Sequence, residues 1–344
     1  MIFEKKLPSV ADLIEEYKLS EDLIKKRIRF IQEIKSILNG TDKRKLLIIG
    51  PCSADREDAV IDYVKKLSRL QIEVADRLLF VPRVYTSKPR TNGLGYKGLI
   101  HRPSQNSESD DMLAGLIAVR KMHLHVIEKT GMFCADEVLY PESIYYVLDL
   151  LAYATIGARS VENQGHRLIA SGLEIPTGMK NPMSGYLNTL INSLQAAQHP
   201  QSMVYRGWVV KTEGNKYAHA ILRGYNDSFG VSHPNYHYET LCQLHDLCKK
   251  NNIHNMSLIV DCNHGNSNKQ YDEQERIALE IMNNCLKNHA LNSFVKGFMI
   301  ESYLKDGNQL VGGNEYGKSI TDPCMGWDKT ECFIRTLCEM LIDE

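Results

Sequence analysis

The stretch Leu258-Ile259-Val260-Asp261-Cys262-Asn263-His264-Gly265-Asn266-Ser267-Asn268-Lys269 shows a pattern that recurs along the chain. Its apolar start, residues 258–260, predicts a short buried β-strand. The strand opens into a loop that offers a thiol, an imidazole, amide groups and an ammonium, none of which packing requires. Apolar strands that end in polar or metal-binding residues occur at several other places in the sequence.

Similar apolar runs predict eight strands, at residues 46–49, 78–84, 132–135, 155–158, 176–179, 218–222, 258–260 and 297–300. Helical patterns such as Val60, Val64 and Leu67 lie between or after them. Strands that alternate with helices indicate a parallel sheet, and eight such units in about 300 residues fit an α/β fold of the (β/α)8 (TIM) barrel type. A doubly wound open sheet is the competing architecture, but no GxGxxG follows the first strand.

Residues 1–45 differ from the repeating units and predict an N-terminal helical extension. Ser20 suits a helix N-cap, Ile24, Ile28 and Ile31 follow at helical spacing, and Gly40 suits the helix end. We expect this extension to make oligomer or regulatory contacts, while residues 46–344 form the catalytic barrel. An added β-hairpin is expected at about residues 202–218, with arms at 204–211 and from 217 onward joined through 213–215.

The composition excludes several classes of protein. Lys and Arg total 41 against 42 Asp and Glu, so the overall charge does not indicate binding to nucleic acid or to an anionic membrane. The first twenty residues contain no signal-peptide core, and no run approaches the ~18 apolar residues of a membrane span. Nine cysteines without a CxxC pair argue against a zinc ribbon or a disulfide framework, and predict a reduced, cytoplasmic location.

In a (β/α)8 barrel the active site lies at the C-terminal ends of the strands. Six cations fall at these positions, far more than one carboxylate requires: Arg83, Lys88, Arg90, Arg159, Lys180 and Arg223. Sulfur, nitrogen and oxygen ligands suited to a divalent transition ion fall there too: Cys52, His264, Glu301 and Asp322. Each residue alone has an ordinary structural explanation, but their convergence on one rim of one predicted fold favours a catalytic site.

Eight ordered motifs at compatible spacings resemble those of type I 3-deoxy-D-arabino-heptulosonate 7-phosphate (DAHP) synthases. They are Gly50-Pro51-Cys52-Ser53, Lys88-Pro89-Arg90-Thr91, Gly157-Ala158-Arg159, Gly178-Met179-Lys180-Asn181, Leu222-Arg223-Gly224, Asp261-Cys262-Asn263-His264, Met299-Ile300-Glu301-Ser302 and Gly317-Lys318-Ser319-Ile320-Thr321-Asp322. The segment Asn92-Gly93-Leu94-Gly95-Tyr96-Lys97-Gly98 is similar to the alpha-type branch of that family.

The resemblance implies a homodimeric or homotetrameric enzyme that condenses phosphoenolpyruvate with erythrose 4-phosphate and releases phosphate. It assigns phosphoenolpyruvate binding to Arg83, Lys88, Glu137, Ala158, Arg159, Lys180 and Arg223. It assigns erythrose 4-phosphate binding to Lys88, Pro89, Arg90, Thr91 and Asp322. One divalent ion per subunit (Mn, Fe, Co, Zn or Cu) would be held by Cys52, His264, Glu301 and Asp322, and catalysis would depend on Lys88, Cys52 and His264.

Three other functions compete with this interpretation. The sister enzyme that makes 3-deoxy-D-manno-octulosonate 8-phosphate is disfavoured by the Arg90-Thr91 pair. A class II aldolase requires a His-rich ligand set, which the strand ends do not supply. A catalytically inactive regulatory barrel would have lost a ligand or a cation, and none is visibly lost.

Alpha-type relatives are commonly inhibited by Phe or Tyr in a pocket away from the active site. That pocket is built from the N-terminal extension, the loop after the third strand, the segment before the fifth strand and the added hairpin. Here Tyr140 replaces an acidic residue and Glu174 replaces a small one. A buried pocket that absorbs both changes loses charge pairing or gains steric strain, so we expect weak or absent inhibition by Phe, with any effector response shifted to another aromatic metabolite. The alternative is that Glu174 takes over the contact with the effector ammonium, which would keep inhibition but change its selectivity.

Overall fold

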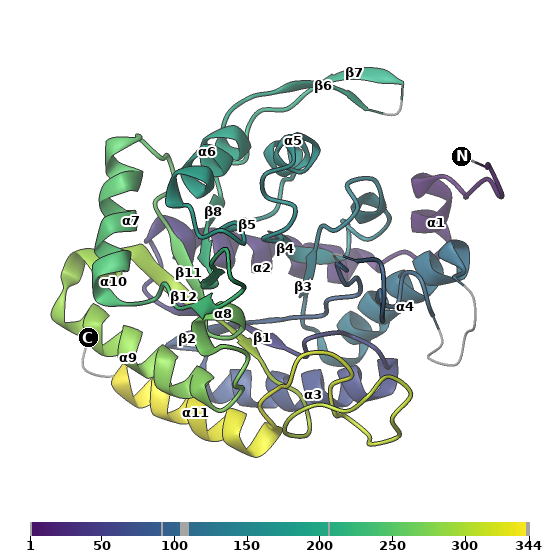
Figure 1. Cartoon of the computed structure of the whole chain (residues 1–344). Helices are drawn as coiled ribbons and strands as arrows, with labels where there is room; N and C mark the ends of the chain where they lie inside the picture. Colours follow the sequence, from purple (N-terminus) through teal and green to yellow (C-terminus); the bar gives the residue numbers. More distant parts are fainter. Residues whose placement is uncertain (1, 91, 104–109, 206, 342–344) are drawn as a thin grey trace.

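The computed structural model describes residues 2–90, 92–103, 110–205 and 207–341, and eight parallel strands form its centre (Figure 1). The strands are β1 (Lys45–Gly50), β2 (Leu78–Pro82), β3 (Cys134–Glu137), β4 (Leu151–Ile156), β5 (Thr177–Lys180), β8 (Ala218–Leu222), β11 (Leu258–Asp261) and β12 (Val295–Glu301). Their hydrogen-bonded order is β2-β1-β12-β11-β8-β5-β4-β3. A parallel bridge between Arg83 and Ala135 joins the two ends of this order. The predicted (β/α)8 barrel is confirmed.

Helices surround the barrel and bury the outward face of its strands (Figure 1). They are α3 (Glu57–Val74), α4 (Met112–Thr130), α5 (Gln164–Gly172), α6 (Leu187–Gln198), α7 (Tyr238–Lys250), α9 (Glu273–Lys287), α10 (His289–Phe294) and α11 (Trp327–Met340). Only a short 3-10 helix, η1 (Ser143–Tyr146), connects β3 to β4. Strands covered on both faces must be apolar throughout, which is why they read as continuous hydrophobic runs.

Strand β4 begins and ends earlier than its predicted range of 155–158. The run 151–156 is buried throughout and forms the strand, whereas Gly157 and Ala158 lie beyond its end. A Cβ at Gly157 would lie 2.3 Å from Glu137 Oε1, so the absent side chain gives the Glu137 carboxylate its space.

The N-terminal extension contains α1 (Val10–Glu16) and α2 (Glu21–Asn39). The Leu23 N–H donates to Ser20 Oγ over 3.4 Å, and Gly40 ends α2 with φ 82°, so both predicted caps are confirmed. Of the isoleucines at helical spacing, Ile24 and Ile28 are 43% and 51% exposed, whereas Ile31 is buried. The buried face of α2 instead continues toward the C-terminus, through Ile31, Ile34, Ile37 and Leu38.

Helix α2 lies across the N-terminal end of the barrel. Its Arg27 donates to the carbonyls of Leu148 and Leu151, where β4 begins, and Ser257, just before β11, donates to the Leu38 carbonyl. The N-terminal end of the barrel is therefore occupied by packing, and the C-terminal end remains available for a site.

The added hairpin consists of β6 (Ser202–Tyr205) and β7 (Trp208–Lys211), which pair antiparallel with Tyr205 opposite Trp208. It projects away from the barrel (Figure 1). Its turn includes Gly207, so the predicted closure at residues 213–215 is wrong. Residues 213–215 instead lead into β8. Before that strand begins, the Asn215 side chain donates to the Ile175 carbonyl.

Apart from the opening at the C-terminal ends of the strands, a second cavity of about 690 Å³ lies where α2, η1, the segment before β5 and the hairpin meet. Its lining includes Lys35, Tyr145, Glu174 and Tyr205. Tyr140 does not line it; its hydroxyl is instead hydrogen-bonded to His101 Nε2 at 2.8 Å. Of the two sequence changes expected at an effector pocket, the structure places only Glu174 at this cavity.

Within the described ranges, no helix is both long enough and apolar enough to cross a membrane.

Candidate active site

A cavity of about 240 Å³ opens at the C-terminal ends of the barrel strands. Twelve of the residues singled out from the sequence line it: Cys52, Arg83, Lys88, Pro89, Arg90, Glu137, Ala158, Arg159, Lys180, Arg223, His264 and Asp322. Glu301 lies beneath it and is fully buried. Thr91 lies outside the described residues.

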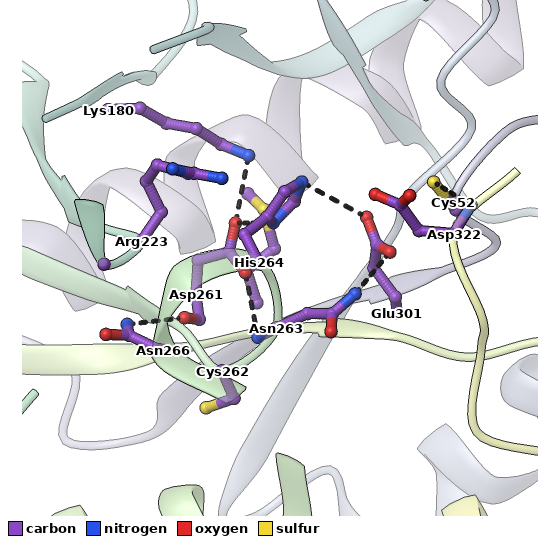
Figure 2. Close-up of polar contacts among 12 residues, drawn as sticks. Cys52, Lys180, Arg223, Asp261, Cys262, Asn263, His264, Asn266, Glu301 and Asp322 are labelled. Atoms are coloured by element: carbon purple, nitrogen blue, oxygen red, sulfur yellow. Dashed lines mark hydrogen bonds and ion pairs between the residues drawn. The ribbon is translucent and has the colours of Figure 1, made fainter. Parts of the chain in front are cut away.

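Three of the four predicted metal ligands converge beside this cavity. One ligand atom each of Cys52, Glu301 and Asp322 lies within 4.8 Å of the other two. They come from the loop after β1, the end of β12 and the loop before α11, segments that only the closed barrel brings together. Figure 2 shows Cys52 and Asp322 beside the Glu301 carboxylate.

His264 lies next to this group rather than within it. Its Nε2 is 3.7 Å from Glu301 Oε1, and its Nδ1 is 2.9 Å from Asp261 Oδ2 (Figure 2). The backbone of His264 is in the left-handed region, with φ 48°, at the start of the short helix α8 (His264–Ser267). Of the four ligands expected at one point, three therefore converge, and the His264 imidazole lies beside them, next to the Glu301 carboxylate.

The Glu301 carboxylate is the electrostatic centre of this group. Burial alone would raise its pKa, but Arg83, followed by His264 and Lys88, lowers the pKa of Glu301 to about 2. Arg83 Nη1 donates to Oε1, and Asn263 Nδ2 donates to Oε2. The carboxylate is therefore ionised and held in a fixed orientation.

The surroundings shift the pKa of the Cys52 thiol in the opposite direction from that of Glu301. Burial raises the pKa of the thiol, and Glu301 adds to that effect, while the Lys88 ammonium opposes it. Lys88 Nζ lies 3.1 Å from Cys52 Sγ, and the Asp322 N–H donates to the same sulfur over 3.4 Å. A buried thiol with a raised pKa loses its proton when a metal cation binds to the sulfur, because the cation stabilises the thiolate.

The donor set fits a divalent transition ion. It offers one sulfur, two carboxylates and an imidazole whose pKa burial lowers despite the opposing charge of Asp261. A neutral imidazole is the form that binds metal, and mixed S, N and O ligands suit borderline ions rather than Mg²⁺. Cys52, His264, Glu301 and Asp322 are thus suited to hold one such ion.

The six predicted cations line the cavity together. Lys180 Nζ contacts Asp261 Oδ2 at 3.0 Å, and Arg83 pairs with Glu301. Burial lowers the pKa of the Arg223 guanidinium; Asp261 opposes this effect and Arg159 adds to it. Cations gathered in a partly buried cavity repel one another, so the arrangement favours ligands that carry several negative charges.

Backbone carbonyls later in the same loop hold the Lys88-Pro89-Arg90 segment in place. The Lys88 N–H donates to the Lys97 carbonyl over 2.9 Å, and Arg90 Nε donates to the Tyr96 carbonyl over 2.7 Å. These contacts direct the loop across the mouth of the cavity, where Lys88 and Arg90 line it.

Sequence reasoning missed several residues of the site. Asp261 pairs with Lys180 and contacts His264, Asn263 orients Glu301, and Lys269 lines the cavity with its Nζ 2.8 Å from Asp322 Oδ1. All three belong to the 258–269 stretch, so the polar composition of that loop was the available signal. Met183, Asn226 and Ser232 also line the cavity, and nothing in the sequence marked them.

The chain is similar to known proteins over nearly its whole length. Residues 22–335 match the model of the DAHP synthetase I family. A Tyr-sensitive phospho-2-dehydro-3-deoxyheptonate aldolase of Escherichia coli (strain K12) is 38% identical over 315 residues, covering 89% of this chain and 85% of that protein. The Phe-sensitive enzyme of the same organism is 35% identical over 339 residues, covering 96% and 93%.

A solved structure gives the same result at the level of the fold. The phospho-2-dehydro-3-deoxyheptonate aldolase of Francisella tularensis SCHU S4 superposes with a TM-score of 0.91 at 30% identity, covering 99% of this chain and 98% of the other. The barrel, the cation-lined cavity and these similarities agree, and the chain belongs to the DAHP synthetase I family.

Proposed function

We propose that the chain condenses phosphoenolpyruvate with erythrose 4-phosphate and water, giving DAHP and phosphate, the first step of the shikimate pathway to aromatic amino acids. The observation that carries this proposal is the meeting of six cations with the Cys52–Glu301–Asp322 group in one cavity of a DAHP synthetase I family member. Two phosphates and a carboxylate account for the cations, and an aldehyde that must be polarised accounts for the ligand group.

Phosphoenolpyruvate is assigned to the side of the cavity formed by β2, β4, β5 and β8. Arg159 and Arg223 suit its phosphate and carboxylate, because guanidinium groups bind such oxyanions through two parallel hydrogen bonds. Lys180 and Arg83 add charge from the cavity wall, and Lys88 reaches this substrate from the loop. The Ala158 N–H and the Glu137 carboxylate, the latter through water, complete the assignment.

Erythrose 4-phosphate is assigned to the loop after β2. Arg90 suits its phosphate, Pro89 fixes the backbone beside it, and Thr91 belongs to the same motif. Lys88 then lies between the two substrates, and Asp322 faces the aldehyde end from the opposite loop.

The reaction joins C3 of phosphoenolpyruvate to the aldehyde carbon of the tetrose phosphate. A divalent ion on Cys52, His264, Glu301 and Asp322 supplies Lewis acidity toward the aldehyde oxygen when it is bound. Lys88 donates a proton to the alkoxide that develops as the C–C bond forms. Water adds at C2, and cleavage of the C2–O bond then releases phosphate.

A product assay distinguishes this function from that of the sister enzyme. With phosphoenolpyruvate present, we expect phosphate release with erythrose 4-phosphate and little release with arabinose 5-phosphate. The reverse preference would assign the chain to octulosonate phosphate synthesis instead.

Replacing Arg159 with alanine should raise the KM for phosphoenolpyruvate. Loss of one charged partner of a phosphate costs about 1.5–3 kcal/mol, or about a tenfold to hundredfold weaker interaction. Initial rates at varied phosphoenolpyruvate measure the effect. Arg335→Ala, which removes an exposed arginine of α11, is the control. An unchanged KM in Arg159→Ala would contradict the assignment.

The chain is proposed to act as a homodimer or homotetramer in a reduced, cytoplasmic compartment. The hairpin supports self-association, since Val204, Trp208 and Val209 are each more than 70% exposed at 78%, 74% and 79%. Exposed apolar groups of this size gathered on one projecting element favour an interface. The nine cysteines, which all lie within the described residues, form no disulfide, which suits a reduced compartment and preserves the Cys52 thiol.

We expect weak or absent inhibition by Phe, with any response shifted to another aromatic metabolite. Glu174 places a carboxylate at the second cavity, and its charge acts on Lys35 and Arg27. That carboxylate would lie near the carboxylate of a bound amino acid unless it takes over the ammonium contact. Separate titrations of Phe, Tyr and Trp against initial rate decide the matter, and strong inhibition by micromolar Phe would refute the expectation.

A further inference from the structure

A buried polar network outside the barrel wall connects the Lys88 loop to the strand that carries Glu137. Its three members are Thr86 at the start of the loop, Asp136 in β3 and His123 in α4, which are 2%, 2% and 0% exposed. None of the three lines the cavity. They are far apart in sequence, and the barrel brings them together behind the site.

Asp136 is the centre of the network, because its carboxylate accepts four hydrogen bonds. Oδ1 accepts from the Thr86 N–H over 3.1 Å and from the Glu137 N–H over 2.7 Å. Oδ2 accepts from Thr86 Oγ1 over 2.6 Å and from His123 Nε2 over 3.1 Å. Burying a carboxylate without hydrogen-bond donors costs free energy. The four donors and the Asp136 carboxylate therefore hold one another in place.

The network connects two parts of the catalytic cavity. Thr86 is two residues before Lys88, and Glu137 directly follows Asp136 in β3. One side chain therefore determines where the Lys88 loop leaves the barrel and how the Glu137 backbone is oriented. His123 contributes from a helix rather than a loop, and its Nδ1 has no hydrogen-bond partner among the described residues. The imidazole thus contributes through Nε2 alone.

We propose that Asp136, held by His123, is a positioning residue that aligns Lys88 and Arg90 with Glu137 through Thr86. This inference rests on the proposed function for its kinetic consequences. Small displacements of reacting groups have large effects on rate, and about 1 Å of misplacement can cost about a hundredfold. Lys88 and Glu137 are also assigned to phosphoenolpyruvate, but Arg159, Lys180 and Arg223, which supply most of the charge for that substrate, lie outside the network. Arg90, assigned to erythrose 4-phosphate, lies in the Lys88 loop that Thr86 begins. We therefore expect the network to affect the tetrose phosphate and turnover more than phosphoenolpyruvate.

The proposal predicts a specific kinetic pattern for Thr86→Val and His123→Leu. Each variant removes one hydrogen bond to Asp136 and preserves most of the side-chain volume. We expect kcat to fall and the KM for erythrose 4-phosphate to rise, each by about tenfold, with the KM for phosphoenolpyruvate within about twofold of wild type. His123→Gln retains an N–H donor and should recover most of the lost activity.

Thr177→Val is the matched control. Thr177 is a fully buried threonine in β5 whose Oγ1 donates to the Ile175 carbonyl over 3.0 Å, and it does not line the cavity. It should lose thermal stability as Thr86→Val does, without the change in the KM for erythrose 4-phosphate. If Thr86→Val and His123→Leu alter only thermal stability, or raise both KM values equally, the positioning role is wrong.

Hydrogen exchange gives a readout that does not depend on activity. In mass spectrometry of the full chain, peptides covering residues 84–90 should exchange faster in Thr86→Val and His123→Leu than in wild type or Thr177→Val. Unchanged exchange in those peptides would overturn the proposal even if turnover fell. A wild-type protein inactive with both substrates would refute the proposed function instead, and the exchange comparison would still decide whether Asp136 anchors the loop.

Discussion

Replacing Cys52 with alanine should abolish turnover while the protein remains folded. The thiol is one of three ligand groups that converge beside the cavity, and removing it leaves only oxygen and nitrogen donors for the ion. The thiol contacts Lys88 Nζ and the Asp322 N–H at the rim, not the barrel interior, so the cost in stability should be about 1 kcal/mol. The measurements are phosphate release, thermal unfolding and metal content of the purified variant.

Cys262→Ala is the matched control for this substitution. Cys262 is also fully buried and also follows a barrel strand, but its sulfur lies apart from the ligand group (Figure 2). Its variant should retain turnover. His264→Ala should behave like Cys52→Ala, since it removes the only imidazole beside Glu301 among the described residues. Turnover above about 5% of wild type in metal-replete buffer would refute the ligand assignment.

Replacing Lys88 with methionine should lower kcat by about 10²- to 10⁴-fold, the range expected when a general acid is removed. Lys88 Nζ is 3.1 Å from Cys52 Sγ and lines the cavity, which places its proton beside the ligand group and within reach of both substrates. Methionine retains the length of the side chain but has no proton to donate. Pre-steady-state and steady-state phosphate release would locate the loss in the chemical step.

Lys97→Met is the control within the same loop. Its ammonium is directed toward Asp110, 3.3 Å away, and it does not line the cavity. It should therefore leave kcat within about twofold of wild type. A Lys88→Met enzyme with normal kcat and only a raised KM would show that Lys88 binds substrate without donating the proton.

The barrel could be predicted because its signals are local. Strands buried on both faces give continuous apolar runs, and their polar ends mark the active-site rim regardless of which helix follows. Boundaries were less predictable where the signal was ambiguous. Gly207 and Gly214 both have positive φ, 79° and 82°, and the sequence does not reveal which of them closes the hairpin.

The site shows the same division between local and tertiary information. The ligand types were readable, because cysteine, histidine and carboxylates at strand ends are rarely needed for packing. The position of His264 was not, since it depends on Asp261 and on a left-handed backbone conformation that only the folded loop sets. The network of Thr86, His123 and Asp136 was also invisible, because its members are joined only by tertiary contacts.

The most direct test of the account is phosphate release from phosphoenolpyruvate and erythrose 4-phosphate by metal-stripped enzyme. After chelation, with metal content confirmed below one ion per ten chains, release should fall to background. Adding back Mn²⁺, Fe²⁺, Co²⁺, Zn²⁺ or Cu²⁺ separately should restore it with at least one of these ions, and Cys52→Ala should not respond. An unchanged rate in the stripped wild-type enzyme would contradict the assignment of Cys52, His264, Glu301 and Asp322 as the ligands of a catalytic ion.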